Sequence, residues 1–187
     1  MNIFFVDADP RTAAEALVDK HVVKMIIESA QLLSIAHRVL DGKEYQGISA
    51  SGSRKVKRWK LAFPMESTIY QATHVNHPSA KWVRKSAANY DWLYSHFIAL
   101  IGEYNHRYGK IHACNARLAK ALINVPANIP NVEFTWPPSA MPQEYIISEN
   151  SVDCYREYYI KGKKHLHKWT GRPKPSWIPS GAPLWIN

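Results

Sequence analysis

Apolar residues recur every three or four positions between Asp19 and Leu33, a spacing that is typical of a helix with a wide apolar face. Four polar residues follow the same spacing, so they should form one narrow stripe along this helix. This first polar stripe consists of His21, Lys24, Glu28 and Gln31. It predicts a helix sunk in the core that points four reactive groups into a cleft. The alternative is a helix at the core boundary, with a satisfied histidine and a surface Lys–Glu pair four residues apart.

A second and longer helix is predicted for residues 79–108, with Pro78 as a suitable first-turn residue. The helix of the first stripe is expected to extend over residues 12–40, and its pattern allows an interruption near Asp19. Two long helices that pack with their polar stripes together would enclose a polar cleft, which either tunes pKa values for chemistry or holds a polar ligand. The second polar stripe consists of Asn89, Trp92, His96, Glu103, Arg107 and Lys110.

The remaining segments show weaker periodicity. In chain order they are predicted as a short extended segment at residues 2–6, a flexible basic loop at 42–60, a shorter helix at 113–124, a Pro-rich extended wrap at 125–142, a last helix at 149–168 and an extended basic and aromatic tail at 169–187. The pattern therefore predicts a mainly α protein, a single helical domain of residues 1–187 built around two long packed helices.

The length of 187 residues suits one domain with a sizeable hydrophobic core. No apolar run reaches the ~20 residues that a membrane helix needs, and residues 1–7 lack the basic start of a signal peptide. Only Cys114 and Cys154 occur, without a CxxC pair, so neither a disulfide scaffold nor a cysteine zinc site is expected. These features predict a cytoplasmic protein without a membrane partner.

The chain is strongly basic, with 24 Lys and Arg against 15 Asp and Glu and a net charge of +9 at pH 7. This balance favours a polyanionic partner, either duplex DNA or a nucleotide ligand. Seven Trp and ten Tyr offer aromatic faces that can stack on bases, although aromatic residues also fill cores. The cations predicted to hold phosphates are Arg54, Lys55, Lys57 and Arg58 of the loop, Lys81 and Arg84 of the second helix, and Lys163, Lys164 and Arg172 farther along.

Several familiar motifs are missing from the sequence, among them GxxxxGK[ST], GxGxxG, GxSxG and HExxH. P-loop and dinucleotide-dependent enzymes are therefore disfavoured, and neither a metal site nor a cofactor is expected. Carboxylates remain as candidates for catalysis. Burial of Glu28 among apolar residues would raise its pKa, while neighbouring cations would lower it. Glu103 precedes Arg107 by four residues, which predicts a structural ion pair.

The order of these segments resembles the phage pyrimidine-dimer DNA glycosylase/AP lyase family, known as the endonuclease V family. That family has a helix with the pattern D-x-H-Φ-x-x-E-x-x-E (Φ apolar), whose last Glu is catalytic, and a G-H-V segment before a long basic helix. Here Asp19, His21 and Glu28 keep that spacing, and Thr73-His74-Val75 precedes the second helix. The resemblance covers about residues 15–110 and implies that Glu28 is catalytic and that His21 lines the site. The chain also looks like small proteins common in tailed-phage genomes, which implies a phage-infected bacterial host.

Two features depart from the family pattern. The family's nucleophile is the α-amine exposed when Met is removed ahead of a small residue, whereas Asn2 follows Met1 here and suits that processing poorly. Asn2 also lies several residues farther from the helix than in the family. A desolvated Lys20 or Lys24 is the alternative nucleophile for a Schiff base at C1′. Ile27 replaces a basic residue of the family, so lyase activity is less expected than base excision.

These observations predict a DNA-binding enzyme that acts on nucleobases, an N-glycosylase for damaged or modified DNA with AP-lyase activity as an optional second step. The target nucleotide would leave the base stack and enter the cleft. Glu28 would act as acid or base, or stabilise the sugar cation, and Lys24 would act as nucleophile or electrostatic partner. The residues predicted to contact the base or sugar are His21, Gln31, Asn89, His96 and Arg107, with Trp82 or Trp92 stacking.

Two other functions remain open from the sequence. One is a non-catalytic phage protein that sequesters a nucleotide signal of host defence, and the other is an enzyme of phage base hypermodification. Tight binding of an intact mononucleotide or cyclic nucleotide, with little duplex binding, would indicate the first. Duplex binding with a steep salt dependence would indicate a DNA enzyme.

Overall fold

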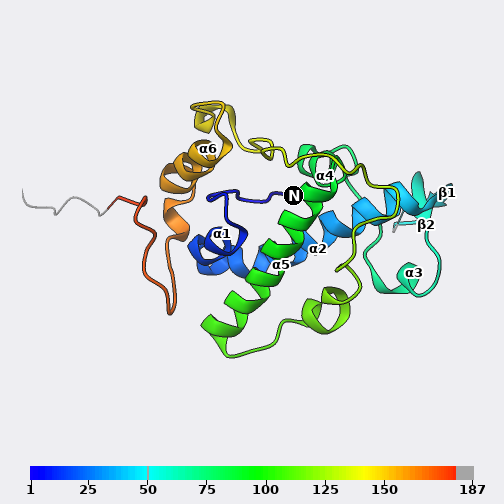
Figure 1. Ribbon diagram of the computed structural model, residues 1–187, viewed down its shortest axis with the longest axis horizontal. Helices are drawn as coiled ribbons and strands as arrows, with labels where there is room; N and C mark the ends of the chain where they lie inside the picture. Colours follow the sequence, from blue (N-terminus) through cyan, green and yellow to red (C-terminus); the bar gives the residue numbers. More distant parts are fainter. Residues whose placement is uncertain (50, 180–187) are drawn as a thin grey trace, which may run out of the picture.

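The structure, a computed structural model, describes residues 1–49 and 51–179. The chain is mainly α, and its two longest helices, α2 (Asp19–Asp41) and α5 (Ala87–Tyr108), pack against each other (Figure 1). The sheet found among the described residues has two strands. The predicted fold class, a mainly α protein built around two long packed helices, is confirmed.

Helix α1 (Pro10–Ala16) precedes α2 and packs against α5. Residues 17–18 adopt extended backbone with ψ of 145° and 155°, which separates α1 from α2. The break frees the first N–H of α2, and Asp19 N–H donates to the Lys168 carbonyl oxygen at 2.9 Å. An interruption near Asp19 was allowed by the sequence pattern, and it is present.

The long helix predicted for residues 79–108 is two helices, α4 (Pro78–Val83) and α5. Ser86 explains the break, because its hydroxyl oxygen accepts a hydrogen bond from Asn89 N–H at 3.1 Å and caps α5. A serine in this position competes with the helix for backbone hydrogen bonds. The prediction of one continuous helix was therefore wrong.

Residues 42–60, predicted to form a flexible loop, form an antiparallel hairpin instead. Its strands are β1 (Lys43–Ile48) and β2 (Lys55–Lys60). The base of the hairpin is held by Arg38 of α2, whose fully buried guanidinium donates to the Trp59 carbonyl oxygen at 2.8 Å. A buried guanidinium requires such partners, so Arg38 ties the hairpin to the helix. The loop prediction was wrong because charged residues occupy both strands and hide the alternation of a β-strand.

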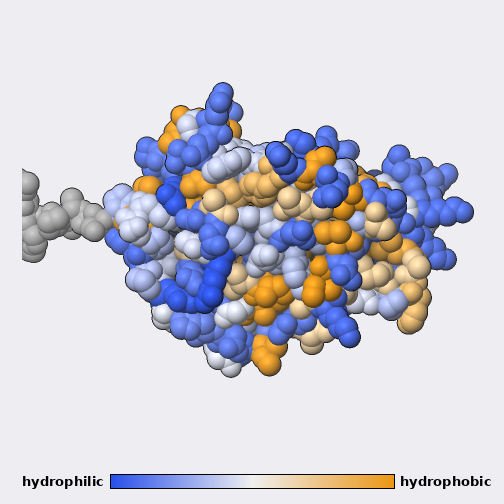
Figure 2. Space-filling model, in the orientation of Figure 1, coloured by the Kyte–Doolittle hydropathy of each residue, from blue (hydrophilic) through white to orange (hydrophobic). Residues whose placement is uncertain are grey.

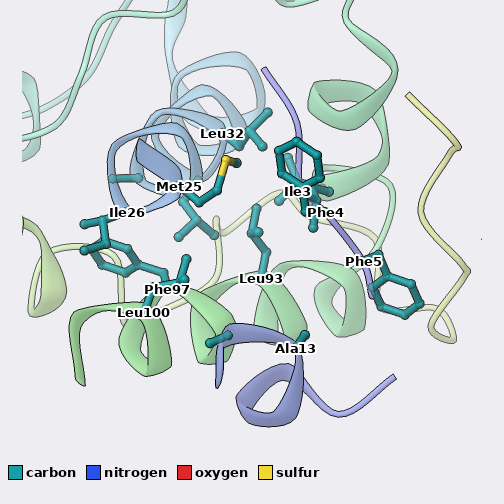
Figure 3. Close-up of a cluster of buried hydrophobic side chains, with 14 of the residues drawn as sticks. Ile3, Phe4, Phe5, Ala13, Met25, Ile26, Leu32, Leu93, Phe97 and Leu100 are labelled. Carbon is teal, nitrogen blue, oxygen red and sulfur yellow. The ribbon is translucent and has the colours of Figure 1, made fainter. Parts of the chain in front are cut away.

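The core lies between α2, α5 and the N-terminal extended segment. Figure 3 shows Met25 and Ile26 of α2 close to Leu93 and Phe97 of α5, and all four side chains are fully buried. The middle of the contact between the two long helices is therefore apolar, and polar pairs such as His37–Tyr90 and Asp19–Arg107 lie toward its ends. The polar cleft that we predicted between their stripes does not form at this interface.

Shorter elements complete the described chain: α3 (Met65–Thr68), the π-helical turn η1 (Asn115–Ala119), the 3-10 turn η2 (Gln143–Tyr145), α6 (Ser151–Glu157), the π-helical turn η3 (Tyr158–Gly162) and the 3-10 turn η4 (Lys164–Leu166). The helices predicted at 113–124 and 149–168 are thus present as short helical pieces. Residues 125–142, hereafter the wrap, contain neither α-helix nor strand, as predicted, and pass over α4 (Figure 1). Residues 169–179 also lack regular structure, and the rest of the predicted tail, 180–187, lies outside the described residues.

Candidate active site

Glu28 of α2 faces the N-terminal extended segment. The main-chain N–H of Asn2 donates to Glu28 Oε2 at 2.7 Å. The Asn2 side chain fixes this position, because its Nδ2 donates to the Ala140 carbonyl oxygen at 2.8 Å while its Oδ1 accepts from Ile3 and Phe4 N–H at 2.7 and 3.0 Å. Phe4 adopts a φ of 53°, which is strained for a non-glycine residue. The longer sequence separation, a departure from the family pattern, therefore does not keep residue 2 away from the helix.

Lys24 lies one turn before Glu28, with its Nζ 3.2 Å from Glu28 Oε1. The Lys24 side chain is 66% exposed and the Glu28 side chain 14% exposed. Lysines become nucleophilic when they are desolvated, and Lys24 is well solvated. The geometry thus favours Lys24 as the electrostatic partner of Glu28 over its alternative role as nucleophile. Gln31 is half-buried one turn farther along α2.

His77, in the segment before α4, lies near this carboxylate. His77 caps α4 by accepting a hydrogen bond at Nδ1 from Ser79 N–H at 3.2 Å, which leaves Nε2 to carry the proton of the neutral ring. Burial lowers the pKa of His77, the Met1 amine and His74 lower it further, and Glu28 raises it. The charges of both Glu28 and the Met1 amine therefore act on His77. Thr73-His74-Val75 of this segment contributed to the family resemblance, but His77 was not among the residues predicted for the site.

His21 packs against the N-terminal segment that carries Asn2. Its Nδ1 lies 2.5 Å from the Tyr159 hydroxyl oxygen, and its ring stacks on Phe4 with 4.2 Å between the ring centroids. Burial lowers the pKa of His21 to about 4, with further lowering from Lys163 and Lys24. A neutral His21 thus packs against Phe4, two residues after Asn2. Its direct contact with substrate stays a prediction.

Two members of the second polar stripe bind the segment that leads into α1. Trp92 Nε1 donates to the Ala8 carbonyl oxygen at 2.6 Å, and His96 Nδ1 donates to the Pro10 carbonyl oxygen at 2.9 Å. Both side chains are buried. The contacts observed for them are with the protein's own main chain, so their part in substrate binding stays a prediction that this geometry does not support.

Asn89 and Trp82 hold the wrap. Asn89 Oδ1 accepts from Thr135 N–H at 2.9 Å, and its Nδ2 donates to Thr135 Oγ1 at 3.0 Å. Trp82 Nε1 donates to the Thr135 carbonyl oxygen at 2.7 Å. Three hydrogen bonds therefore clamp one residue of the wrap, and the predicted roles of Asn89 and Trp82 at the substrate likewise lack a supporting contact.

Arg107 and Glu103 form the ion pair that their spacing predicted, with Nε 3.0 Å from Oε2. Arg107 also reaches Asp19 Oδ1 at 3.1 Å, and Arg172 donates to both oxygens of Glu103. Burial raises the pKa of Glu103, but hydrogen bonds from Arg172 and Arg107 outweigh it and lower that pKa. The network joins α5 to residues 169–179, so Arg107 and Arg172 hold the fold together rather than facing Glu28.

A cationic groove of about 380 Å³ lies between β2 and the segment before α4. His74 lines it and also acts electrostatically on His77, so the groove is linked to the Glu28 site through these two histidines. Arg84 shapes it by donating to the Val75 carbonyl oxygen at 2.7 Å, and Lys55 is exposed on the same strand. Figure 2 shows hydrophilic residues gathered over the β1–β2 end. The cationic residues that line the groove are Arg54, Lys57 and Arg58.

Further cations lie on the opposite side of Glu28, near His21. Lys163 and His165 both lower the pKa of His21, which places them beside it. Lys163 Nζ also sits 4.6 Å from the centroid of the Tyr158 ring. Lys164 and Lys81 are exposed. Cations predicted to hold phosphates therefore lie toward both ends of α2, with Glu28 between them along the helix.

Buried His96 makes folding sensitive to acid. Burial lowers its pKa from 6.5 to about 4, and its Nε2 has no partner among the described residues. The unfolded chain therefore binds this proton more tightly, and stability falls as the pH drops from 6.5 toward 4.

We expect His96→Asn, which keeps a donor toward Pro10, to be less stable than the wild type at pH 7. Between pH 6.5 and 4.5, however, its free energy of unfolding should fall by about 2 kcal/mol less than that of the wild type. Urea unfolding at several pH values measures this difference. His165→Asn is the control, because His165 is exposed, and its curve should run parallel to that of the wild type. Parallel curves for His96→Asn would contradict the assignment.

The described residues, 1–49 and 51–179, contain neither a metal-binding cluster nor a membrane-spanning helix. Within these residues, no three His, Cys, Asp or Glu side chains are grouped so that they could hold a metal ion. In the same part of the chain, no helix combines the length and the apolar character needed to cross a membrane. Cys114 and Cys154 are buried free thiols.

The fold and the site together define a mainly α, basic protein with a carboxylate-centred site between two cationic flanks. A family model described as pyrimidine dimer DNA glycosylase matches residues 1–116. The chain therefore belongs to the pyrimidine dimer DNA glycosylase family, as the resemblance around Asp19, His21 and Glu28 predicted. Membership makes it a DNA glycosylase of DNA repair, with DNA as its partner. Searches of curated proteins and of solved structures found no match.

Proposed function

We propose that Glu28 and the main-chain nitrogen of Asn2 form the reaction centre at which this glycosylase breaks the glycosidic bond of one pyrimidine of a dimer in duplex DNA. The observation that carries the proposal is the 2.7 Å hydrogen bond from Asn2 N–H to Glu28 Oε2. It joins a poorly exposed carboxylate to a nitrogen that a single peptide-bond cleavage would turn into an amine. Both residues lie in the part of the chain that the family model matches.

Glu28 has the surroundings that base excision requires. When the bond between C1′ and the base nitrogen breaks, its electron pair leaves with the base, and positive charge develops on the sugar. A fixed carboxylate of low exposure stabilises that charge more strongly than water does, as carboxylates do in glycoside cleavage. A water molecule then forms the new bond to C1′ and loses one proton, and the base nitrogen takes up one proton. Lys24, with its Nζ 3.2 Å from Glu28 Oε1, holds the carboxylate in place.

Cleavage of the peptide bond between Met1 and Asn2 would add lyase chemistry at the same place. The lone pair of the new amine would attack C1′ as the base departs, and Glu28 would accept the proton that the nitrogen loses. The nitrogen would next expel the ring oxygen O4′, which takes up a proton, to give a Schiff base at C1′. Loss of a proton from C2′ would then eliminate the 3′ phosphate and cut the strand.

The cationic flanks supply the contacts that hold DNA over this centre. Phosphates on one side would bind the groove cations Arg54, Lys57 and Arg58, and those on the other side would bind Lys163 and Lys164. Neither set reads base identity, since phosphate contacts position the duplex without specifying sequence. Recognition of the dimer would therefore come from unstacking at the damaged step, where a nucleotide leaves the duplex at lower cost.

Incubation of excess protein with a duplex that carries one cyclobutane pyrimidine dimer tests the proposed function. We expect excision from the damaged strand, no excision from an undamaged duplex of the same sequence, and binding that weakens steeply with salt. Binding without excision across dimer and other damaged duplexes would contradict the proposal.

A further inference from the structure

Trp136 exposes 52% of its surface although it sits on a rigid support. Its ring packs edge-on against the fully buried ring of Phe5, with 5.4 Å between the centroids. The preceding residue, Thr135, is clamped by hydrogen bonds from Asn89 and Trp82. A large aromatic surface that is already held in place loses little conformational freedom when it binds a ligand.

This ring lies close to the proposed reaction centre. The wrap and the N-terminal segment run side by side in opposite directions, since Trp136 contacts Phe5 and Ala140 accepts a hydrogen bond from Asn2. Three residues of extended chain, from Asn2 to Phe5, span at most about 10 Å. Bases along one strand rise by about 3.4 Å each. Trp136 is therefore within a few bases of Glu28.

A second aromatic ring, Phe134, precedes Trp136 by two residues, and two cations occur in and just after the helix that holds the wrap. Phe134 is 36% exposed and packs against both Phe5 and Trp82, with centroid distances of 6.2 and 6.1 Å. Trp82 belongs to α4, which carries the exposed Lys81, and the exposed Lys85 follows just after this helix. Aromatic faces bordered by cations are the recurring design of sites for unpaired nucleotides, because the bases stack and the phosphates pair with the cations.

From these contacts we propose that Trp136 is a stacking residue for a base displaced from the duplex beside the pyrimidine dimer. The inference rests on the proposed function and adds a specificity-determining residue to it. A displaced base has lost its stacking neighbours, and the indole face replaces one of them. Trp136 lies beyond residues 1–116, the part that the family model matches, so this contact would be a feature that the C-terminal part of this chain contributes.

The test compares dissociation constants for two duplexes, one intact and one with a tetrahydrofuran abasic analogue, whose opposite base is free to leave the stack. We expect Trp136→Ala to weaken binding of the abasic duplex by about 10- to 100-fold and to change binding of the intact duplex by less than threefold. Trp136→Phe should retain most of the affinity. Ile123→Ala is the control, because Ile123 is also half exposed, at 55%, and should bind like the wild type.

The salt dependence distinguishes stacking from phosphate binding. Stacking releases no counterions, so the slope of log Kd against log salt should be the same for Trp136→Ala and the wild type. Trp136→Leu, which keeps an apolar contact with Phe5, provides a second variant if the alanine variant does not fold, and it should lose affinity likewise. A changed slope, an equal loss on both duplexes, or behaviour like Ile123→Ala would overturn the inference.

The two proposals fail in different ways. If the wild type excises dimers and the Trp136 variants bind the abasic duplex normally, only the stacking role is overturned. If the wild type excises no dimer from duplex DNA, the proposed function is overturned, and the stacking role with it.

Discussion

Glu28→Gln is expected to lower the single-turnover rate of dimer excision by roughly 100- to 10,000-fold, the range for losing a positioned acid–base or charge-stabilising group. Glutamine has nearly the same shape, and its amide oxygen can still accept the hydrogen bond from Asn2. The substitution therefore removes the negative charge and leaves the contact. Affinity for a dimer duplex should stay within a few-fold of the wild type, so the loss should fall on the rate and not on binding. Quench-flow or manual single-turnover assays with excess protein measure the rate.

The chain offers a closely matched control in Glu157→Gln. Glu157 pairs with Lys161 at the same four-residue spacing as Glu28 and Lys24. The side chains of Glu157 and Lys161 are 18% and 67% exposed, and those of Glu28 and Lys24 are 14% and 66% exposed. Each substitution breaks one such ion pair, but of the two glutamates only Glu28 contacts Asn2. Equal rates for the two variants would remove Glu28 from the chemistry.

The sequence predicted Glu28 because two kinds of information agree at that residue. Periodicity identified the helix and its polar stripe, and the spacing of Asp19, His21 and Glu28 matched a catalytic pattern. Neither kind of information could reveal the partner of the carboxylate. Asn2 reaches Glu28 through an extended segment without periodicity, and the contact depends on a hydrogen bond to Ala140, far along the chain.

The second polar stripe shows why periodicity alone is a weak guide to function. Trp92, His96 and Asn89 sit on one face of a helix just as catalytic residues would. In the structure they bond to backbone groups at Ala8, at Pro10 where α1 begins, and at Thr135 of the wrap, and such groups need partners when they are buried. Such segments leave no periodic trace in the sequence. A stripe that serves backbone groups therefore looks the same as a stripe that serves a substrate.

The hairpin was missed for a related reason. Its strands are rich in Lys, Arg and Glu, so the alternation of a half-buried strand is masked. What stabilises it is Arg38, buried at the end of α2, which no local pattern links to residues 43–60. The basic character of the segment was correctly read, and the fold adds a rigid groove where a mobile loop was expected.

Lyase activity is expected to depend on whether residue 2 carries a free amine. A chain that begins at Asn2, produced by removing a cleavable tag placed directly before it, should form a borohydride-trapped covalent adduct with dimer DNA. A chain that retains Met1 should form at least about 100-fold less adduct through Asn2, because an amide nitrogen has no available lone pair for attack on C1′. Both forms keep Glu28, so base excision should decline less than adduct formation. Denaturing gels after borohydride reduction measure the adduct.

Identification of the trapped residue distinguishes the Asn2 amine from other candidate nucleophiles. Lys24→Met in both forms is the matched test of the only other nitrogen that pairs with Glu28 among the described residues. It should leave trapping by the Asn2-first chain within a few-fold, since an exposed lysine lacks the desolvation that makes lysine nucleophilic. Mass spectrometry of the digested adduct should find the sugar on the N-terminal peptide. Adduct on the Lys24 peptide, or trapping abolished by Lys24→Met, would transfer the nucleophile from residue 2 to the lysine. The role of Glu28 as the stabilising carboxylate would stand in either case, because both nitrogens lie against the same side chain.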